Sequence, residues 1–488
     1  MASPLATLDP QPLWRHFQML CDTPRPSKHE AAVVAKIEAF AAAHQLTCER
    51  DTVGNVLIRK PATAGMEDRV GVVMQSHLDM VPQKNNDKQH DFLTDPITPV
   101  RDGDWIRADH TTLGADNGIG AAAMLAVLES RDIAHGPLEA LFTIDEEAGM
   151  TGAKGLAANW IEGELLFNLD TEDEGELYVG CAGGVNVNAV FPPEWQPTGP
   201  NMAGYTLSVK GLLGGHSGLD IHLGRGNANQ MAALFVARLQ AAFPVQLHAF
   251  NGGSLRNAIP REATIGLALN AEQKAAVLAL FTAFKNDMEA RYRQTEPHLC
   301  IELEECGLPA QILSLQQSRQ LIASIVSCPS YPTRMSDALP GVTETSNNLA
   351  TVTLAQDAVR IKCLVRSLLD SARDDLGLAL CNHFALAGAS THTDGEYPGW
   401  TPDPESALLQ TMRTVYQQHY QQEPAIKVIH AGLECGILGA IYPNWDMISF
   451  GPTIRCAHSP DEKVHIGSVQ AFWQCLIKGL SAVPCVNR

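Results

Sequence analysis

The segment LEALFTIDEE, residues 138–147, decides the fold that this sequence predicts. Its first part, Leu138 to Ile144, is typical of a buried strand, and three consecutive carboxylates follow it. Acidic side chains this close repel one another unless cations lie nearby. Because neighbouring residues of an extended chain point to opposite sides, Glu146 and Glu147 can take different roles, one binding a metal and one moving a proton. An isolated triplet of this kind is more often a solvated turn, so the surrounding segments decide.

Two further apolar runs end in potential metal ligands. Val70 to Met74 leads to His77, with Asp79 two residues later, and the run 165–169 ends in Asp170. Open α/β sheets place their ligand sites at such strand ends. In an extended chain Asp79 points to the same side as His77, so its carboxylate could hold the far nitrogen of that imidazole. Three strands that each end in a potential ligand favour a metal site.

Two loop residues complete the set of potential ligands. Asp116 lies in a glycine-flanked turn before a helix expected over Ile119–Leu128, and small neighbours let the backbone approach a metal closely. One carboxylate can bridge two cations about 3.5–4 Å apart. His458 follows a strand expected over Trp445–Phe450 and precedes Ser-Pro, which suits a rigid loop. Histidine and carboxylate ligands together are typical of a two-metal hydrolytic site.

These motifs carry a resemblance to a known family. They are SHLDMVPQK at 76–84, the long segment 91–120, LFTIDEEAGMTGAKGL at 141–156, NLDTED at 168–173, GGHSG at 214–218 and HSPDEKVHI at 458–466. With them the chain resembles the co-catalytic zinc peptidases of the aminoacylase/carboxypeptidase family. Within that family it resembles the aminoacyl-histidine dipeptidases, also called Xaa-His or carnosinase-like dipeptidases.

The resemblance implies two Zn²⁺ ions per chain, for which Mn²⁺ or Co²⁺ could substitute because they accept the same nitrogen and oxygen ligands. It places His77, Asp116 and Asp170 on one metal. It places Asp116, Glu147 and His458 on the other.

The same resemblance implies the catalytic residues: Glu146 as general base, Asp79 as the carboxylate behind His77, and His216 as the residue that stabilises the tetrahedral intermediate. Three further side chains are expected to contact substrate. Asn257 does so by resemblance, and Arg366, after a strand expected over 359–365, could hold a C-terminal carboxylate in a bidentate fork. Glu434 could face a substrate amine, with a buried salt bridge as the alternative.

The chain length predicts two domains. At 488 residues the chain is too long for one ordinary domain. We expect an α/β fold with a discontinuous catalytic domain, 1–183 and 398–488, whose mixed, largely parallel sheet is flanked by helices. An inserted α+β domain of the lid or dimerisation type would occupy 184–397, with room for two lobes near 185–295 and 296–397. The family habit predicts a homodimer, and the size of the insert favours His216 acting within its own chain.

Composition narrows the function classes. A net charge of −19 argues against a nucleic-acid surface. Twelve cysteines without a CxxC pair, and no signal-peptide pattern in Met1–Phe17, predict reduced thiols in the cytoplasm. No apolar run approaches the ~20 residues of a membrane span. The sequence has neither HExxH nor GxSxG, so single-zinc and serine mechanisms lose support.

We therefore predict a metal-dependent dipeptidase that acts on unblocked dipeptides, preferentially Xaa-His including β-alanyl-histidine (carnosine). Its mechanism would use a bridging water and Glu146 as general base. An N-acyl-amino-acid deacylase or a tripeptide aminopeptidase could use the same site. An alternative of another class is a non-catalytic metal-binding homologue or an interaction protein.

Overall fold

The structure is a computed structural model that describes residues 3–486. The chain forms two compact units. The first contains the chain up to Gly180, Pro402–Val428 and the chain from Leu433 onward, and the second contains Cys181–Thr401 with Ile429–Gly432. The first unit is thus discontinuous in sequence. The function of the second unit as a lid stays a prediction.

A mixed sheet forms the centre of the first unit. Its strands lie in the order β1 (Thr47–Arg50), β2 (Val56–Lys60), β6 (Leu138–Thr143), β3 (Val72–His77), β7 (Leu165–Asn168), β21 (Asp446–Ser449), β8 (Glu176–Cys181) and β20 (Ala425–Ile429). The central strands β6, β3, β7 and β21 pair in parallel, whereas β1, β2 and β8 pair antiparallel. The predicted α/β fold with a mixed sheet is therefore confirmed.

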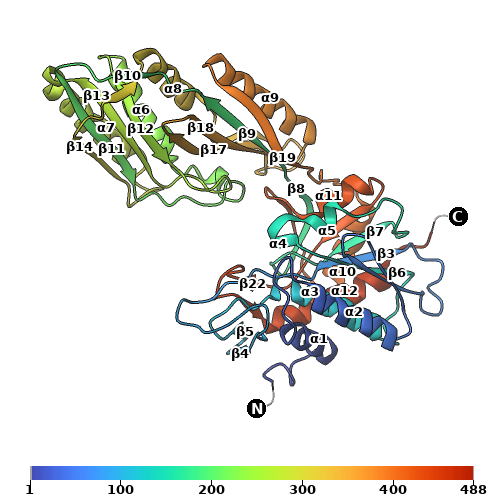
Figure 1. The fold of residues 1–488 in the computed structure, drawn as a ribbon. Helices are drawn as coiled ribbons and strands as arrows, with labels where there is room; N and C mark the ends of the chain where they lie inside the picture. The colour runs from blue at the N-terminus through green and yellow to red at the C-terminus, as the bar shows by residue number, and fades with distance from the viewer. Residues whose placement is uncertain (1–2, 487–488) are drawn as a thin grey trace. The chain divides into compact units, whose positions relative to one another are not determined.

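Helices flank this sheet (Figure 1). They include α1 (Gln11–Cys21), α2 (Ala31–Ala43), α3 (Ala115–Glu129), α10 (Ala407–Tyr420) and α12 (Ile466–Ala482), with the shorter α4 (Glu146–Gly149), α5 (Thr151–Lys154) and α11 (Glu434–Ile441). Helix α3 packs between α1 and β3, and α10 packs against α12 and β21. Because α3 is covered on several sides, it is apolar all round and almost wholly buried.

The expected element over Ile119–Leu128 is found as the regular part of α3. Asp116 and Asn117, near its start, have non-helical backbone angles. A small sheet lies in the same unit, in the order β22 (Ile454–Arg455), β23 (Lys463–His465), β5 (Trp105–Ala108) and β4 (Pro99–Asp102). It places the chain segment after His458 next to the segment before Asp116.

The second unit is an antiparallel sheet with helices. The strand order is β14 (Cys300–Cys306), β11 (Met202–Lys210), β13 (Ala263–Asn270), β12 (Gln246–Gly252), β17 (Thr343–Leu354), β18 (Val359–Ser367), β9 (Gly183–Phe191) and β19 (Ser390–Tyr397), with β16 (Pro332–Met335) beside β17 and a separate pair β10 (Trp195–Pro197) and β15 (Gln311–Leu313). Its main helices are α6 (Ala228–Gln240), α7 (Lys274–Arg291), α8 (Leu315–Ser327) and α9 (Asp370–Leu386), the last of which runs along β9 and β19 (Figure 1). Single turns η1 (Ile221–Leu223) and η2 (Ala271–Gln273) complete it.

The suggested division of the insert into lobes near 185–295 and 296–397 stays a prediction, and strand pairing crosses the boundary between these two segments. Strand β9, from the first segment, pairs with β18 and β19 of the second, and β14, from the second, pairs with β11 of the first. One sheet therefore runs through the unit. Its middle joint, between β12 and β17, consists of the pairs Asn251↔Thr353 and Gly252↔Val352. The hydrogen-bonding partners of β9 and β14 lie far away along the chain, so segment length did not reveal them.

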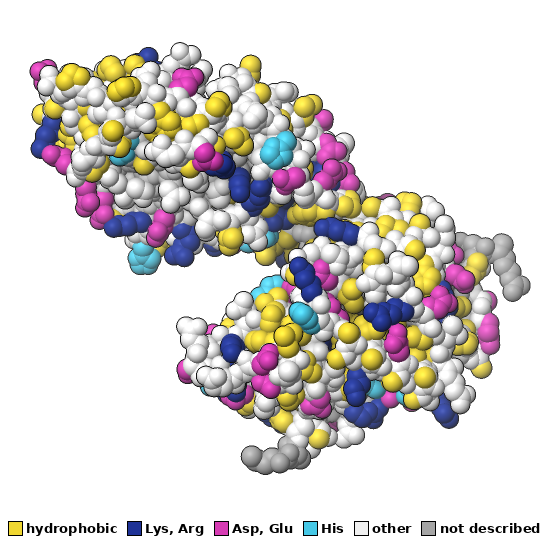
Figure 2. Space-filling view, viewed as in Figure 1, with side chains coloured by type: hydrophobic (Ala, Val, Ile, Leu, Met, Phe, Trp, Pro, Cys, Tyr) yellow, Lys and Arg dark blue, Asp and Glu magenta, His cyan; other side chains and the backbone are white. Residues whose placement is uncertain are grey.

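The surface carries charges of both signs. On the faces shown in Figure 2, acidic and basic side chains are interspersed rather than gathered by sign. Among residues 3–486, no helix combines the length and the apolar character that crossing a membrane requires.

Candidate metal centre

Parallel strands deliver the predicted ligands to one edge of the first unit's sheet. His77 is the last residue of β3, where it pairs in register with Thr143 at the end of β6. Glu147 follows β6 by four residues, and Asp170 follows β7 by two. Because these strands are parallel, their carboxyl ends share an edge, which is the usual ligand-binding edge of an α/β sheet.

Asp116 lies between two histidines. Its Oδ1 is 3.1 Å from His77 Nε2, and its Oδ2 is 3.2 Å from His458 Nε2. Gly114, two residues earlier, has a φ of 69°, a left-handed conformation that glycine adopts at little cost. A carboxylate with one oxygen toward each histidine is arranged to bridge two cations.

An additional carboxylate accompanies each histidine. His77 Nε2 is 3.3 Å from Asp170 Oδ1, and His458 Nε2 is 2.9 Å from Glu147 Oε2. Two groups of three residues each bring one potential ligand atom per residue to within 4.8 Å of the others. The first group is His77, Asp116 and Asp170, and the second is Asp116, Glu147 and His458. The structure thus brings together the two sets of residues that the sequence analysis assigned to two metals.

Glu146 faces the same centre. Potential ligand atoms of His77, Glu146 and Glu147 also lie within 4.8 Å of one another. Burial, reinforced by the negative charges of Asp170 and Glu434, raises the pKa of Glu146 well above its usual value. A carboxyl group with a raised pKa is better suited to accept a proton. Since distance alone also allows Glu146 to be a ligand, the division of roles between Glu146 and Glu147 stays a prediction.

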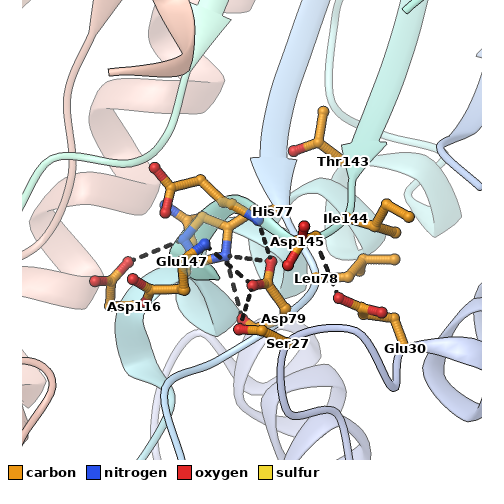
Figure 3. A network of polar contacts seen from close by, with 12 residues as sticks. Ser27, Glu30, His77, Leu78, Asp79, Asp116, Thr143, Ile144, Asp145 and Glu147 are labelled. Atoms are coloured by element: carbon orange, nitrogen blue, oxygen red, sulfur yellow. Dashed lines mark hydrogen bonds and ion pairs between the residues drawn. The ribbon is translucent and has the colours of Figure 1, made fainter. Parts of the chain in front are cut away.

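Asp79 is connected to both halves of this arrangement. Figure 3 shows it between His77 and Ser27. Its Oδ1 is 3.4 Å from His77 Nδ1, and it accepts the backbone N–H groups of Glu146 (3.0 Å) and Glu147 (3.2 Å). Burial alone would raise the pKa of Asp79, but hydrogen bonds from His77, Ser27 and Glu146 lower it to about 2. Asp79 is therefore ionised, and it orients an imidazole and the start of α4 together.

Buried acids behind Asp79 fix the turn from β6 into α4. Glu30 Oε1 accepts the backbone N–H of Asp145 at 3.1 Å, and Thr151 Oγ1 donates to Asp145 Oδ2 at 2.6 Å. Figure 3 shows Glu30 beside this turn. The roles of Glu30 and Thr151 were not predicted: Glu30 binds a backbone N–H 115 residues away along the chain, and Thr151 binds the side chain of Asp145.

The electrostatics of the centre fit divalent cations. Burial raises the pKa values of Glu147 and Asp170, and with the charges of Asp116 and Asp170 it raises that of Glu172 to about 8. Glu147 Oε1 is buried without a hydrogen-bond partner among the described residues. Crowded buried carboxylates with an unfilled acceptor are groups that a cation stabilises. Imidazole and carboxylate ligands are compatible with Zn²⁺, Mn²⁺ or Co²⁺.

Sequence reasoning missed several polar residues that hold the ligands. Asn117 Nδ2 donates to the Leu169 carbonyl at 2.8 Å and to the Asp170 carboxylate. Ser76, beside His77, donates in turn to Asn117. Asn117 follows Asp116 directly in the glycine-flanked turn, so its place in that motif was a usable signal.

Glu434 is fully buried at the start of α11. Its Oε2 accepts from Gln75 Nε2 at 2.6 Å and from Thr143 Oγ1 at 2.7 Å. Burial raises its pKa to about 8. Within the described chain it forms no ion pair with Lys or Arg, so the alternative of a buried salt bridge is not found. Its contact with a substrate amine stays a prediction.

Arg366, His216 and Asn257 belong to the second unit. Arg366, on β18, is 5% exposed; its Nη1 donates to the Tyr397 hydroxyl at 2.8 Å and its Nε to Ser217 Oγ at 3.3 Å. Over residues 3–486, no acidic side chain forms an ion pair with it. A buried guanidinium with only neutral partners is complementary to a carboxylate, which it can bind in a bidentate manner.

His216 adjoins this guanidinium. Its Nδ1 accepts the backbone N–H groups of Gly218 (3.2 Å) and Leu219 (3.1 Å), and its Nε2 lies 3.4 Å from Arg366 Nη2, which can only donate. Burial and the charge of Arg366 lower its pKa to about 4, so the ring is neutral near pH 7. The side chain of Asn257 is exposed, and its carbonyl accepts the Ser217 N–H at 2.8 Å.

Comparison with known proteins places these features in a family context. A family model described as peptidase family M20/M25/M40 matches residues 73–479. The cytosol non-specific dipeptidase of Escherichia coli is 45% identical over 482 residues, which cover 99% of each chain. The crystal structure of an aminoacylhistidine dipeptidase from Vibrio alginolyticus is 47% identical, with a TM-score of 0.93 over 99% of each chain. The aminopeptidase PepT of Bacillus cereus, 15% identical with a TM-score of 0.57 over 98% of this chain and 99% of its own, shares the fold.

Substitution should separate the roles of the two glutamates. We expect Glu146→Gln to keep both metals and to lower dipeptide hydrolysis by about 10²–10⁴-fold, because it removes a proton acceptor. Glu147→Gln should weaken the metal near His458. Metal content after dialysis and hydrolysis rates would be measured on both variants, with the exposed Glu162→Gln as control. Loss of a metal from Glu146→Gln, with activity falling in proportion, would reverse the two assignments.

Raised pKa values also predict how metal-free stability depends on pH. Glu172 and Glu434, with pKa values raised to about 8, hold protons in the folded chain that they lose in the unfolded chain above the ordinary value of 4.5. His458, raised to about 11, likewise keeps its proton only when folded above pH 6.5. Above the ordinary histidine value of 6.5, histidines with lowered pKa values such as His216 and His430 are neutral in both states. There the folded chain binds more protons than the unfolded chain, and its stability must fall as pH rises.

We thus expect the Tm of the chelator-treated protein to fall between pH 7 and pH 9. Divalent metal replaces the protons, so the difference in Tm between metal-loaded and metal-free protein should widen over the same range. Both forms have the same surface charges, which makes the loaded protein the control. A difference that narrows toward pH 9 would contradict this account of the centre.

Proposed function

The chain belongs to peptidase family M20/M25/M40, and from this premise we propose that it is a two-metal dipeptidase that hydrolyses unblocked dipeptides, preferentially Xaa-His. The observation that carries the proposal is Asp116, with one carboxylate oxygen toward each of two histidines and a further carboxylate beside each of them. The two relatives that match the whole chain at 45% and 47% identity are both named as dipeptidases.

Zn²⁺ is the proposed metal. When bound, two such ions would lower the pKa of a water molecule toward ~7 and polarise the scissile carbonyl. His77 and Asp170 would hold one ion, and Glu147 and His458 would hold the other. Asp116 would bind both ions. The supporting observation is the donor set itself, two imidazoles and three carboxylates whose negative charge is buried.

Glu146 is the proposed proton carrier. Its carboxylate would take the proton of the attacking water and deliver it to the leaving amine. Asp79 supports this role because it fixes the backbone N–H of Glu146 while it orients His77. Because the single carboxylate of Asp79 holds both the proposed base Glu146 and the proposed ligand His77, these two groups keep a constant geometry.

Arg366 and His216 are the proposed substrate-binding groups of the second unit. The guanidinium of Arg366 would bind the C-terminal carboxylate, and His216 would stabilise the developing oxyanion. Among the described residues Arg366 has no acidic partner, and the ring of His216 beside it is neutral near pH 7, which supports these roles. Asn257 is proposed to contact substrate, and Glu434, whose Oε1 is buried without a hydrogen-bond partner among the described residues, to bind the substrate amine.

A homodimer in the cytoplasm is the proposed setting, with His216 acting in its own chain. The twelve cysteines of the sequence include no CxxC pair, which supports a reducing compartment. The Escherichia coli relative is named a cytosol dipeptidase.

Hydrolysis of a peptide panel tests the substrate class. Unblocked dipeptides that end in His, including β-alanyl-histidine, should be cut, whereas N-acetylated dipeptides and pentapeptides should be poor substrates. The physical reason is that Arg366 and Glu434 would each bind one charged end of a short substrate. The rates kcat/KM would be measured with zinc-replete enzyme. Efficient cleavage of N-acyl amino acids would indicate a deacylase, and preference for tripeptides an aminopeptidase.

Arg366→Met should raise KM for a dipeptide much more than KM for the matching dipeptide amide. A hydrogen bond to a charged group contributes about 1.5–3 kcal/mol, which corresponds to roughly 10–100-fold in binding. Arg360→Met is the control, because Arg360 lies on the same strand and is paired with the exposed Asp357. An equal loss on the acid and the amide would show that Arg366 does not bind the carboxylate.

A further inference from the structure

Two buried charged residues lie beside the metal centre without belonging to its ligands. Arg25 is 1% exposed and Glu462 is 2% exposed. Neither takes part in the proposed proton transfer or in substrate binding. Both make their hydrogen bonds to backbone segments that carry the ligands, rather than to ligand side chains. This raises the question of what they contribute to the centre.

Glu462 binds the turn that carries Asp116. Its Oε2 accepts the backbone N–H groups of Leu113 (2.7 Å) and Gly114 (2.9 Å). Its Oε1 accepts those of Ala115 (2.7 Å) and Asp116 (3.3 Å). Four successive N–H groups that converge on one anion resemble the backbone nests that bind anions. Because Glu462 follows His458 by four residues, it ties the loop of one metal ligand to the turn of another.

Arg25 binds the same turn through its carbonyl groups. Its Nη2 donates to the Gly114 carbonyl at 2.6 Å. Its Nη1 donates to the carbonyls of Leu78 (2.8 Å) and Asp79 (3.0 Å), directly after His77. The guanidinium thus joins the end of β3 to the turn, so the segments of His77, Asp116 and His458 are all connected through Arg25 and Glu462.

Two glycines make room for this guanidinium. A Cβ atom added at Gly114 would lie 2.6 Å from Arg25 Nη2, and one added at Gly118 would also lie 2.6 Å from it. Contacts of this length are too short for non-bonded atoms, so any side chain at either position would displace Arg25. The glycines on both sides of Asp116 therefore have a packing reason in addition to a conformational one.

We propose that Arg25 and Glu462 are positioning residues that hold the Asp116 turn with one carboxylate oxygen toward each histidine, and that they thereby set the affinity of the centre for its metals. This inference rests on the two-metal function proposed above. Residues that orient metal ligands typically change metal affinity or activity by about 10–100-fold when they are replaced. Because the turn is already ordered in the metal-free chain, metal binding does not carry the entropy cost of ordering the turn.

Glu462→Gln tests the proposal. The amide keeps the size of the side chain, but its NH₂ group faces backbone N–H donors, so at least one of them loses its acceptor. Metal dissociation constants of chelator-treated chains would be measured by competition with a chromophoric zinc chelator. We expect the weaker-bound zinc to lose about 10–100-fold in affinity. Added zinc should restore part of the activity, with kcat lowered more than KM is raised.

The matched control is Asp461→Asn. Asp461 is the neighbouring residue, it is exposed, and its carboxylate makes no hydrogen bond in the described chain, so this variant removes the same charge without touching the turn. Its zinc affinities should equal those of the wild type. Glu462→Asp, which keeps the charge on a shorter side chain, should fall between Glu462→Gln and the wild type, and it provides the comparison if Glu462→Gln fails to fold.

If Glu462→Gln had the zinc dissociation constants of the wild type, the proposal would be overturned. This holds even if the metal-free variant unfolds at a lower temperature, because unchanged zinc affinity with lower stability is what a purely structural role would give. The dissociation constants are read without substrate. A wild-type protein that binds two zinc ions but cleaves no dipeptide would therefore contradict the proposed function while leaving this test readable.

Discussion

Negative charge buried at one edge of a parallel sheet is the constraint on which the rest of the structure depends. Asp116 lies within a few ångströms of Asp170 on one side and of Glu147 on the other, and Glu146 and Glu172 lie beside these groups. Burial opposes ionisation of most of these groups, so the centre is stable only with protons or cations among the carboxylates. In the metal-free chain His77 and His458 fill part of that need, since their pKa values are raised.

The scaffold orients these acids with dipoles and not with counter-charges. Asp79 receives the first N–H groups of α4, Asn117 donates an amide to Asp170, and Glu462 collects the N–H groups of the Asp116 turn. The buried cation nearby, Arg25, points at carbonyl groups. A lysine or arginine directed at the ligand carboxylates would neutralise them and compete with metal. Backbone and amide dipoles fix the same side chains while leaving their charge available to a cation.

The residues that the sequence predicted are those whose placement is local. His77 and Asp170 follow apolar strands, and their position at the sheet edge follows from strand direction alone. Arg25 and Glu462 were not predicted, because their partners lie 53 to 89 and 346 to 349 residues away along the chain. The pairing of β9 with β18 and of β14 with β11 was not predicted for the same reason, because the partner strands lie far away along the chain. Likewise, the missing acidic partner of Arg366 is a property of packing that no motif encodes.

That missing partner bears on specificity. The guanidinium of Arg366 is 5% exposed and contacts two hydroxyl groups and the neutral ring of His216. Among the described residues it has therefore given up most of its hydration without gaining an anion. Burying a charge in this way is costly unless an opposite charge compensates it. A substrate carboxylate would recover that cost, whereas an amide or a longer chain would leave it in place. Selection for a free C-terminus can therefore arise from the energetics of Arg366 itself, without any contact that repels other substrates.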